Sequence, residues 1–359
     1  MPGNRTADAP AVAAPSSREP DAAVADLSES ELIARIQRRL PPAPAWMIVG
    51  IGDDAAVVEP ERNRLEVLAV DAIVEGVHFD RAFTPPAAIG HRALAVNLSD
   101  LAAMGAAPRL ALLSLALPST LPLRDFDAIV DGFACLAERA RMHVAGGNLT
   151  KSPGPLMLDV TVVGTVKRRG ALLRSGARAG DEIYVSGSIG GAAAGLQMLK
   201  AAALAAAHDT SASSRPPGSG GAIERYLYPD PRVRLGILLG RNRAASACMD
   251  LSDGLADAVS QVARASGVGA VVEAASLPID PDAREWFASR GDDPVAAAIA
   301  GGDDYELLVV VRPRLRSRLA AARAGTPLTR IGVCTADRSI VLRGAGGDRP
   351  WPRGYSHFR

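Results

Sequence analysis

Apolar residues in the first half of the chain alternate between two spacings. Runs rich in Val, Ile and Leu predict β-strands, and apolar residues recurring every three or four positions predict amphipathic helices. The predicted strands span 47–51, 65–70, 109–117 and 156–166, and the predicted helices span 87–104 and 124–142. Alternating strand and helix patterns of this kind indicate an α/β architecture.

A second set of alternating patterns begins near Asp181. Its predicted strands span 183–186, 270–273, 305–311 and 330–333, and its predicted helices span 192–206, 232–239, 255–265 and 312–322. A chain of 359 residues fits two domains. We place the boundary in the basic, glycine-containing stretch 168–178, which gives an N-terminal domain of residues 27–170 and a C-terminal domain of residues 171–359.

Two segments lack any periodic apolar pattern. Residues 1–26 are rich in Ala, Pro and Ser and are expected to form a disordered tail. Residues 208–221 are rich in Ser, Pro and Gly and are expected to form a flexible insert. Between them, Ser28 and Glu31 have the spacing of a capping box, which predicts that the fold begins with a helix there.

The composition excludes several classes of protein. The formal net charge is +1, so no global field recruits nucleic acid or an anionic membrane. No stretch reaches the length of a membrane span, and the start of the chain lacks the pattern of a secretory signal. The three cysteines form no Cys-x-x-Cys pair, which fits a reducing compartment. We therefore expect a cytoplasmic protein.

Aspartates at positions where strand or helix patterns end are the most informative polar residues. They are Asp53, Asp54, Asp71, Asp100, Asp250, Asp253, Asp303 and Asp304. One interpretation is that they only form turns and cap helices. The other is that they converge at strand ends, where open α/β sheets bind ligands. Converging carboxylates need compensating cations, and Mg²⁺ accepts carboxylate oxygens together with substrate phosphates.

Common nucleotide-binding motifs are absent from the sequence. There is no P-loop, no Gly-x-Gly-x-x-Gly after a strand and no protein-kinase catalytic loop. Only three of the 40 basic residues are lysines, so a phosphate site built on lysine has few candidates. Gly146-Gly147 allows close approach of the backbone to a phosphate, although a pair of glycines is weak evidence. The pattern favours a metal–nucleotide complex held through its metal ions.

Taken together, these segments resemble the thiamine-monophosphate kinase family. The matching stretches are 50–58, 71–79, 93–108, 146–147, 174–177, 180–187, 250–255, 301–307 and 354–358. The resemblance implies two α/β domains with the fold of aminoimidazole ribonucleotide synthetase. It also implies a homodimer formed through the N-terminal domains, and ATP with several Mg²⁺ ions bound between the domains.

The resemblance assigns roles by position. Metal ligands are expected at Asp54, Asp71, Asp100, Asp250 and Asp253, at Asn148, and at the backbone carbonyls of Ala69 and Val70. Gly147, Asn148, Arg174 and Ser252 are expected to contact ATP, and His78, Asp303 and Tyr355 to contact thiamine monophosphate. The catalytic residues are expected to be Asp71, Asp253 and Arg174.

The sequence departs from the family pattern at three places. Asn148 stands where the family usually has an aspartate ligand, and Asp303 where it usually has glutamate. Ala69 and Val70 stand where hydroxyl residues are common. These differences bear on metal affinity more than on the reaction.

The implied reaction is transfer of the ATP γ-phosphate to thiamine monophosphate, which gives thiamine diphosphate as the last step of its biosynthesis. The acceptor phosphate has a second pKa of about 6, so no general base is required. Mg²⁺ and Arg174 would screen the repulsion between the two phosphates during direct in-line transfer.

Some alternatives stay open. His78 has a plain role as a locally bonded residue at a strand end. Tyr355 or Trp351 could stack on the thiazolium or could anchor the C-terminal tail. The whole chain could be another ATP-using enzyme of the superfamily, although it lacks the expected reactive cysteines. It could also be a thiamine-phosphate binding protein that has lost metal, for which Asn148 is the only support.

Overall fold

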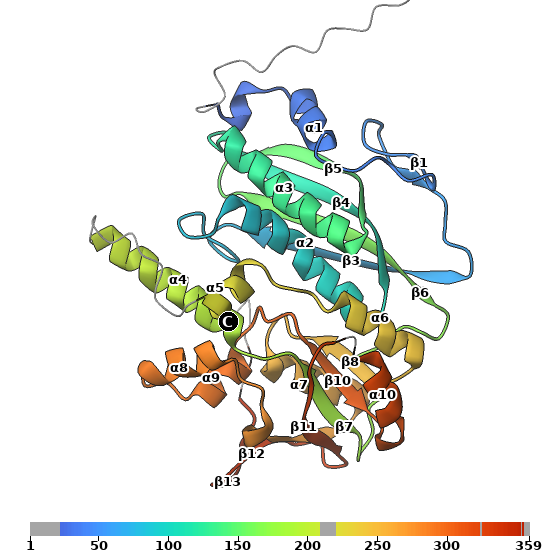
Figure 1. Ribbon diagram of the computed structural model, residues 1–359, viewed down its shortest axis with the longest axis vertical. Helices are drawn as coiled ribbons and strands as arrows, with labels where there is room; N and C mark the ends of the chain where they lie inside the picture. The colour runs from blue at the N-terminus through green and yellow to red at the C-terminus, as the bar shows by residue number, and fades with distance from the viewer. Residues whose placement is uncertain (1–21, 209–219, 324, 353, 355–359) are drawn as a thin grey trace, which may run out of the picture.

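The computed structural model describes residues 22–208, 220–323, 325–352 and 354. The first half of the chain forms a four-stranded sheet covered on one face by two helices (Figure 1). Its elements are β3 (Arg64–Val74), β4 (Ala107–Pro118), β5 (His143–Ser152), β6 (Met157–Lys167), α2 (Pro86–Ala103) and α3 (Leu123–Ala140). The strand order is β3-β6-β4-β5, with β4 and β5 parallel and the other pairs antiparallel.

The alternation of side chains along β6 explains how this sheet packs. Leu158, Val160 and Val162 are fully buried, so every second residue of the strand points into the core. The opposite face of the sheet is open and partly apolar. On β3, Leu68 and Val70 are 67% and 58% exposed. An open apolar face of this kind is typical of a surface that contacts another protein chain.

The second half of the chain forms a seven-stranded sheet in the order β13-β12-β9-β11-β7-β10-β8. Its strands are β7 (Glu182–Ser186), β8 (Ala247–Asp250), β9 (Gly269–Glu273), β10 (Leu307–Val311), β11 (Leu328–Thr335), β12 (Ile340–Gly344) and β13 (Gly347–Pro350). The accompanying helices are α4 (Gly191–His208), α5 (Gly220–Leu227), α6 (Val233–Asn242), α7 (Leu255–Ser266), α8 (Pro281–Ser289), α9 (Pro294–Ala300) and α10 (Arg316–Ala322), with 3-10 turns η3 (Ala274–Ser276) and η4 (Pro313–Leu315).

Helix α2 joins the two halves. It packs against α3 and β3 on one side and against α6 and β8 on the other (Figure 1). At the contact with α6, a Cβ built on Gly236 would lie 2.0 Å from the carbonyl oxygen of Ala102, so only glycine allows the two helices to approach this closely. The packing of α2 brings side chains from both halves to one place.

The structure corrects several boundaries predicted from the sequence. Strand β3 continues to Val74, so Asp71 lies within the strand and does not close it. Residues 143–152, where the sequence predicts no strand, form strand β5, and the expected strand start at Tyr305 lies before β10. Asp100 lies inside α2, in its last turn. The strand signals were hidden by glycine and polar residues, which are rare in strands.

The start of the fold also differs from expectation. The capping box of Ser28 and Glu31 is confirmed at the N-terminus of α1 (Glu29–Gln37). Residues 22–26 of the expected tail, however, pack against the start of α3 and include the 3-10 turn η2 (Val24–Asp26), in which Val24 is buried. Two short strands, β1 (Met47–Val49) and β2 (Val57–Val58), pair before β3. The rest of the predicted tail and most of the predicted insert 208–221 lie outside the described residues.

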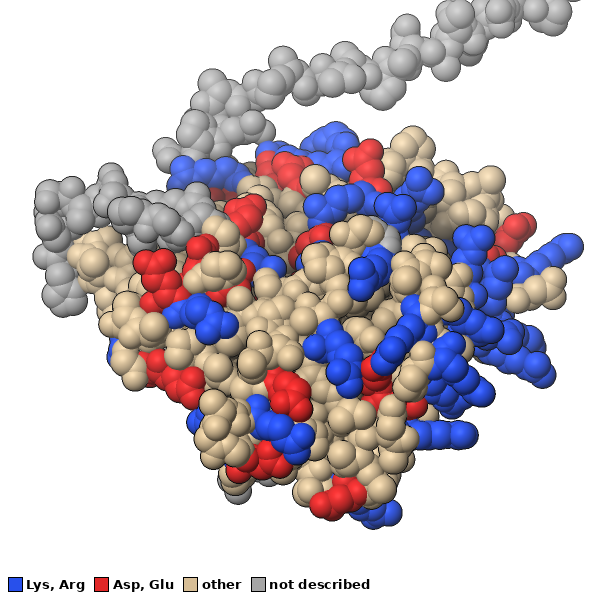
Figure 2. Space-filling view, turned by 60° about the horizontal axis from the view of Figure 1, so that its bottom comes forward, with Lys and Arg blue, Asp and Glu red and all other residues tan. Residues whose placement is uncertain are grey.

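Basic residues are distributed unevenly over the surface. Residues 312–330 contain six arginines and no acidic residue, and α6 carries two further arginines and no acidic residue. Figure 2 shows Lys and Arg gathered on the right of the face in view, the side on which Figure 1 places α6 and α10. The near-neutral net charge is therefore compatible with a locally basic surface over α6 and residues 312–330. Within the described residues, no helix has the length and apolar character needed to cross a membrane.

Candidate active site

Four carboxylates from both halves of the chain converge beside α2. Asp71 comes from β3 and Asp100 from α2, whereas Asp250 ends β8 and Asp253 follows in the turn before α7. The Asp71 and Asp100 carboxyl groups lie within hydrogen-bonding reach, and the charges of Asp250 and Asp253 act on them. We call these four residues the junction cluster. The convergence of these four predicted metal ligands agrees with the second interpretation of the aspartates.

Two buried polar residues of α2 hold the cluster in place. The side chain of Asn97 accepts a hydrogen bond from the backbone N–H of Asp71 (3.0 Å) and also contacts its carbonyl (3.4 Å). The hydroxyl of Ser99 donates to a carboxylate oxygen of Asp250 (2.9 Å). Asn97 and Ser99 are fully buried, so α2 fixes one aspartate from each half of the chain.

The pKa values of three members of the cluster, Asp71, Asp100 and Asp250, are raised. Burial raises the pKa of Asp250 to about 6, opposed by the hydrogen bond from Ser99 and the charge of Arg174. Burial, together with the charges of Asp250 and Asp71, raises the pKa of Asp100 to about 7. Burial also raises the pKa of Asp71, opposed by its hydrogen bond with Asp100. The negative charge of these three carboxylates is therefore only partly compensated by their protein surroundings.

Arg174 is the cation that acts on this cluster. Its charge lowers the pKa of both Asp100 and Asp250. Its guanidinium donates to the amide oxygen of Gln261 on α7 (2.7 Å), which holds the exposed side chain near the junction. A tethered arginine beside carboxylates is suited to contact a phosphate that arrives with its own cations.

In the second half of the chain, the turn at residues 251–254 is hydrogen-bonded to the turn at residues 301–305, next to the cluster. The backbone N–H of Asp303 donates to the carbonyl of Ser252 (2.8 Å), and that of Tyr305 donates to the carbonyl of Leu251 (3.2 Å). Gly254 has φ +87°, and a Cβ there would lie 2.3 Å from the carbonyl oxygen of Gly301. This packing brings the predicted ATP contact Ser252 and the predicted substrate contact Asp303 to one place.

A hollow of about 930 Å³ lies between residues 50–56 and the open face of the first sheet. Asp54, Gly147 and Asn148 line it, together with Asp159 of β6. Asp159 also raises the pKa of Asp71, so the hollow borders the junction cluster. The structure thus places the side chains of the predicted metal ligands in two groups: Asp71, Asp100, Asp250 and Asp253 beside α2, and Asp54 and Asn148 around the hollow.

Gly147, the backbone of residues 69–71 and the candidate Asp304 have contacts that explain them structurally. A Cβ on Gly147 would lie 1.8 Å from the carbonyl oxygen of Leu113, so the pairing of β4 and β5 alone requires glycine. The backbone N–H and carbonyl of Asp71 face Asn97 at the free edge of β3. Because backbone groups of successive residues in a strand point to opposite sides, the carbonyl of Val70 faces β6 and that of Ala69 faces the free edge. Asp304 caps α4 by accepting from Gly190 (2.6 Å) and Ala192 (3.2 Å).

The remaining predictions concern the acceptor. His78 accepts a hydrogen bond from the backbone N–H of Val74 at Nδ1 (3.1 Å), so the local contact weighed for this residue is present. The indole of Trp351 donates to the carbonyl of Ala256 (2.9 Å) and packs against the second core, in agreement with a tail anchor. Tyr355 lies outside the described residues.

A metal site fits this arrangement only in part. Among the residues that the structure describes, no three His, Cys, Asp or Glu side chains are arranged to hold a metal ion by themselves. Asp71, Asp100 and Asp250 nevertheless present oxygen ligands whose pKa values are raised, mainly by burial, and a bound cation would stabilise their ionised forms. Mg²⁺ is usually held by one or two carboxylates plus phosphate oxygens, so a nucleotide would complete the coordination.

Three contributors escaped the sequence prediction: Asn97, Ser99 and Asp159. Asp159 had a readable signal, because it is the one charged residue in the apolar strand β6 before Lys167. Asn97 and Ser99 had a weaker one, since polar residues in a helix buried on all sides need partners. Their partners come from β3 and β8, which no local pattern indicates.

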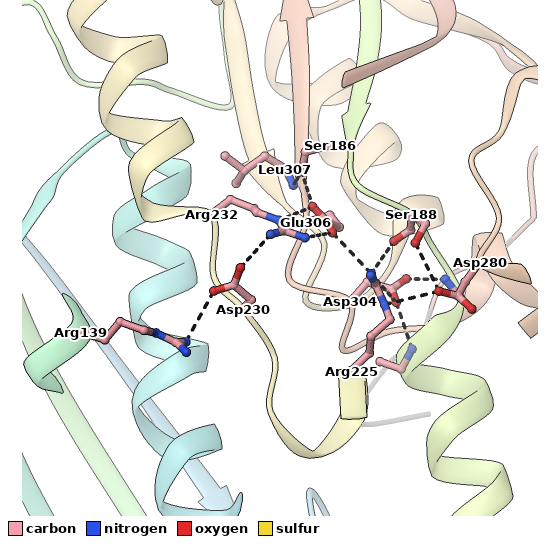
Figure 3. A network of polar contacts seen from close by, with 12 residues as sticks. Arg139, Ser186, Ser188, Arg225, Asp230, Arg232, Asp280, Asp304, Glu306 and Leu307 are labelled. Atoms are coloured by element: carbon pink, nitrogen blue, oxygen red, sulfur yellow. Dashed lines mark hydrogen bonds and ion pairs between the residues drawn. The ribbon is translucent and has the colours of Figure 1, made fainter. Parts of the chain in front are cut away.

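A second polar network lies beside the cluster (Figure 3). Glu306, which is fully buried, is bound by Arg232 (2.5 and 2.7 Å) and approached by Arg225 (3.4 Å). Arg232 also binds Asp230 (2.8 Å), which contacts Arg139 of α3 (3.5 Å). We call these residues and Asp304 the Glu306 network. Its acids are matched by arginines and backbone amides, as expected of a structural element.

The comparisons with known proteins define the class of protein first. Residues 52–166 match the family described as AIR synthase related protein, N-terminal domain, and residues 178–344 match its C-terminal domain. The chain therefore belongs to the AIR synthase related proteins, with two domains of that family.

Relatives narrow the class further. Thiamine-monophosphate kinase from Escherichia coli (strain K12) is 39% identical over 92% of this chain and 98% of its own, and that from Bacillus subtilis (strain 168) is 34% identical over 87% and 94%. The crystal structure of thiamine-monophosphate kinase from Stenotrophomonas maltophilia K279a has a TM-score of 0.77 at 38% identity, covering 89% of this chain and 97% of that one. AaThiL complexed with AMPPCP and TMP has a TM-score of 0.72 at 31% identity, covering 93% and 98%. The chain is a member of the thiamine-monophosphate kinase family.

Proposed function

We propose that this protein is a thiamine-monophosphate kinase, which transfers the γ-phosphate of ATP to thiamine monophosphate and forms thiamine diphosphate. The observation that carries the proposal is the junction cluster of four carboxylates with Arg174, positioned by α2 in a chain of this family. The complex of AaThiL with AMPPCP and TMP supports an ATP-dependent reaction on the monophosphate.

The residues of the cluster suit phosphoryl transfer. Asp71, Asp100, Asp250 and Asp253 would hold Mg²⁺ together with the phosphates of ATP, Asp54 and Asn148 would contribute from the side of the hollow, and the Ala69 carbonyl would contribute from the edge of the first sheet. Bound Mg²⁺ supplies neutralisation of the phosphate charge. Arg174, held by Gln261 of α7, would orient the phosphate. Because the acceptor phosphate is already an anion, the protein needs to align it and requires no general base.

The finer parts of the proposal concern assembly and location. The open apolar face around Leu68 and Val70 supports a homodimer formed through the first sheet. We place the enzyme in the cytoplasm, where its co-substrate ATP is available. Ser252 is proposed to contact ATP and His78, Asp303 and Tyr355 the acceptor.

The test uses the purified full-length protein with ATP, MgCl₂ and thiamine monophosphate, and measures thiamine diphosphate by chromatography. We expect stoichiometric formation of the diphosphate and ADP, and loss of turnover when EDTA removes the metal. Thiamine in place of its monophosphate is the matched control and should give no product. Binding of thiamine monophosphate without turnover at any Mg²⁺ concentration would instead support a binding protein, and absence of both would refute the proposal.

A further inference from the structure

A buried arginine of α2, Arg92, contacts Asp303, one of the residues proposed to bind the acceptor. Arg92 is 1% exposed, and its Nη2 lies 3.3 Å from a carboxylate oxygen of Asp303. Its Nη1 donates to the backbone carbonyl of Tyr226, and its guanidinium lies over the Tyr226 ring, 4.2 Å from the centroid. Burial by itself would lower the pKa of Arg92, but Asp303 and the tyrosines raise it overall, so the guanidinium stays charged.

The carboxylate of Asp303 is fixed on both of its oxygens. The Tyr305 hydroxyl donates to Oδ1 (2.8 Å), and Arg92 approaches Oδ2. Asp303 and Tyr305 also have positive φ values of +67° and +49°, a backbone region that side-chain-bearing residues other than Asn and Asp rarely adopt. The Asp303 side chain is nevertheless 32% exposed. An exposed carboxylate fixed on both oxygens in a strained turn is typical of a group that binds a ligand.

Tyr226 extends the same unit to the first half of the chain. Its hydroxyl donates to the backbone carbonyl of His78 (3.2 Å), and its side chain is almost fully buried. His78 belongs to the loop after β3, whereas Asp303 belongs to the turn before β10. The stacked pair of Arg92 and Tyr226 therefore connects the two proposed acceptor contacts, one from each half of the molecule.

We propose that Arg92 and Tyr226 are positioning residues that set the separation and orientation of His78 and Asp303 for the acceptor molecule. This inference rests on the proposed function, because thiamine monophosphate is the acceptor. Asp303 has a shorter side chain than the glutamate usual in the family. The long side chain of Arg92 extends from α2 to contact it. The fixed carboxylate of Asp303 would face the cationic thiamine moiety. Arg92 and Tyr226 therefore determine selectivity for the acceptor, whereas ATP binds at the junction cluster.

A plain structural role predicts something different. If Arg92 only joined the two halves of the chain, its loss would lower stability and would alter the kinetic constants for ATP and the acceptor together, or neither. A positioning role changes the KM for the acceptor selectively. The two roles therefore separate in steady-state kinetics combined with thermal unfolding.

The experiment compares Arg92→Met, Arg92→Lys and Tyr226→Phe with the wild-type enzyme. Misplacement of a binding group by about 1 Å can cost about 10²-fold. We expect Arg92→Met to raise the acceptor KM by about 10- to 100-fold while the KM for ATP stays within about threefold. Arg92→Lys keeps the charge and should recover part of the loss. Tyr226→Phe should raise the acceptor KM by a smaller factor and serves as the second variant if Arg92→Met does not fold.

Two further variants make the test specific. Asp303→Asn combined with Arg92→Met should be no worse than the more affected single variant, because both act through one carboxylate. Arg232→Lys changes another part-buried arginine of the same junction and should lower the melting temperature without a selective change in acceptor KM. Equal changes in both KM values, an unchanged acceptor KM in folded Arg92→Met and Tyr226→Phe, or full additivity in the double variant would each overturn the proposal.

Calorimetric titration with thiamine monophosphate alone keeps this inference separate from the proposed function. If the wild-type protein binds the monophosphate but does not phosphorylate it, the proposed function fails. The positioning role is then still supported by weaker binding to Arg92→Met, or refuted by unchanged binding. If the wild-type protein does not bind the monophosphate at all, both proposals are refuted.

Discussion

The junction cluster and the Glu306 network are neighbouring groups of carboxylates that differ in the number of arginines bound to them. In the junction cluster, burial raises the pKa of Asp100 and the nearby charges of Asp250 and Asp71 raise it further. In the Glu306 network, burial raises the pKa of Asp304, but Arg225 and two backbone amides oppose the shift. The comparison teaches that burial alone does not identify a functional acid. An acid that its protein neighbours leave uncompensated indicates a site for an external cation.

The strongest way to break this comparison is to remove a charge from the junction cluster. We expect Asp71→Asn to reduce turnover by about 10²–10³-fold, the usual loss when one electrostatic contact to a transition state is removed. The melting temperature should be unchanged or higher, because repulsion among the acids decreases. Asp131→Asn on the exposed surface of α3 is the control. Turnover of Asp71→Asn within threefold of wild type would contradict a role for this residue.

The reverse experiment removes an acid from the Glu306 network. Glu306→Ala leaves Arg225 and Arg232 without their shared partner, and breaking a buried ion pair typically destabilises a protein by about 3–5 kcal/mol. We expect a loss of this size in urea unfolding. Glu306→Gln retains hydrogen-bonding capacity and should lose less. An unfolding midpoint equal to that of the wild type would show that the network contributes little to stability.

A pH series sharpens the comparison at Asp304. Burial raises its pKa from the ordinary 3.8 to about 7 in the folded protein, so the folded state binds this proton more tightly than the unfolded chain. The resulting contribution to stability is fully present below the unfolded pKa and is lost as the pH rises through about 7. The free energy of unfolding of the wild type should therefore fall more steeply between pH 4 and pH 7, roughly, than that of Asp304→Asn. Parallel slopes would argue against the shift.

The smallest expected effect is at Asn148, on the side of the hollow. A neutral amide offers one oxygen to a metal, whereas a carboxylate offers two anionic oxygens. We expect Asn148→Asp to lower the half-saturating Mg²⁺ concentration several-fold at fixed ATP, with little change in stability because the side chain is exposed. Superimposable Mg²⁺ titrations of the two proteins would exclude Asn148 from the metal site.

The sequence predicted the longer elements of the core because their periodicity is strong, but it missed the short buried strand β8, which carries Asp250. The apolar pattern of residues 156–166 predicted β6, in which Leu158, Val160 and Val162 are buried. The capping box of Ser28 and Glu31 predicted the first helix. The sequence did not identify β5, whose Gly146-Gly147 pair is unusual in a strand. The reason for Gly147 is the backbone of Leu113 in a neighbouring strand, and no local pattern contains that information.

The residues of the candidate site were predicted to a similar extent. Where this prediction fell short, the reason was again tertiary packing. The resemblance identified Asp71, Asp100, Asp250 and Asp253, which the structure brings together. The resemblance assigned a role to Asp303 and none to Asp304, whereas the residue pattern alone does not separate two adjacent aspartates that differ only in what lies opposite them. The first faces Arg92 and the second caps α4. Such partners are set by tertiary packing.

Helix α2 has a consequence for how the chain folds. It is buried along nearly its whole length, and its partners belong to both sheets. Neither half of the molecule can therefore complete its core while the other is unfolded, and the two domains should melt in a single transition in spite of their separate sheets. A fragment ending near residue 170 would expose the face of α2 that covers α6 and β8, and it should aggregate where the intact chain stays monodisperse.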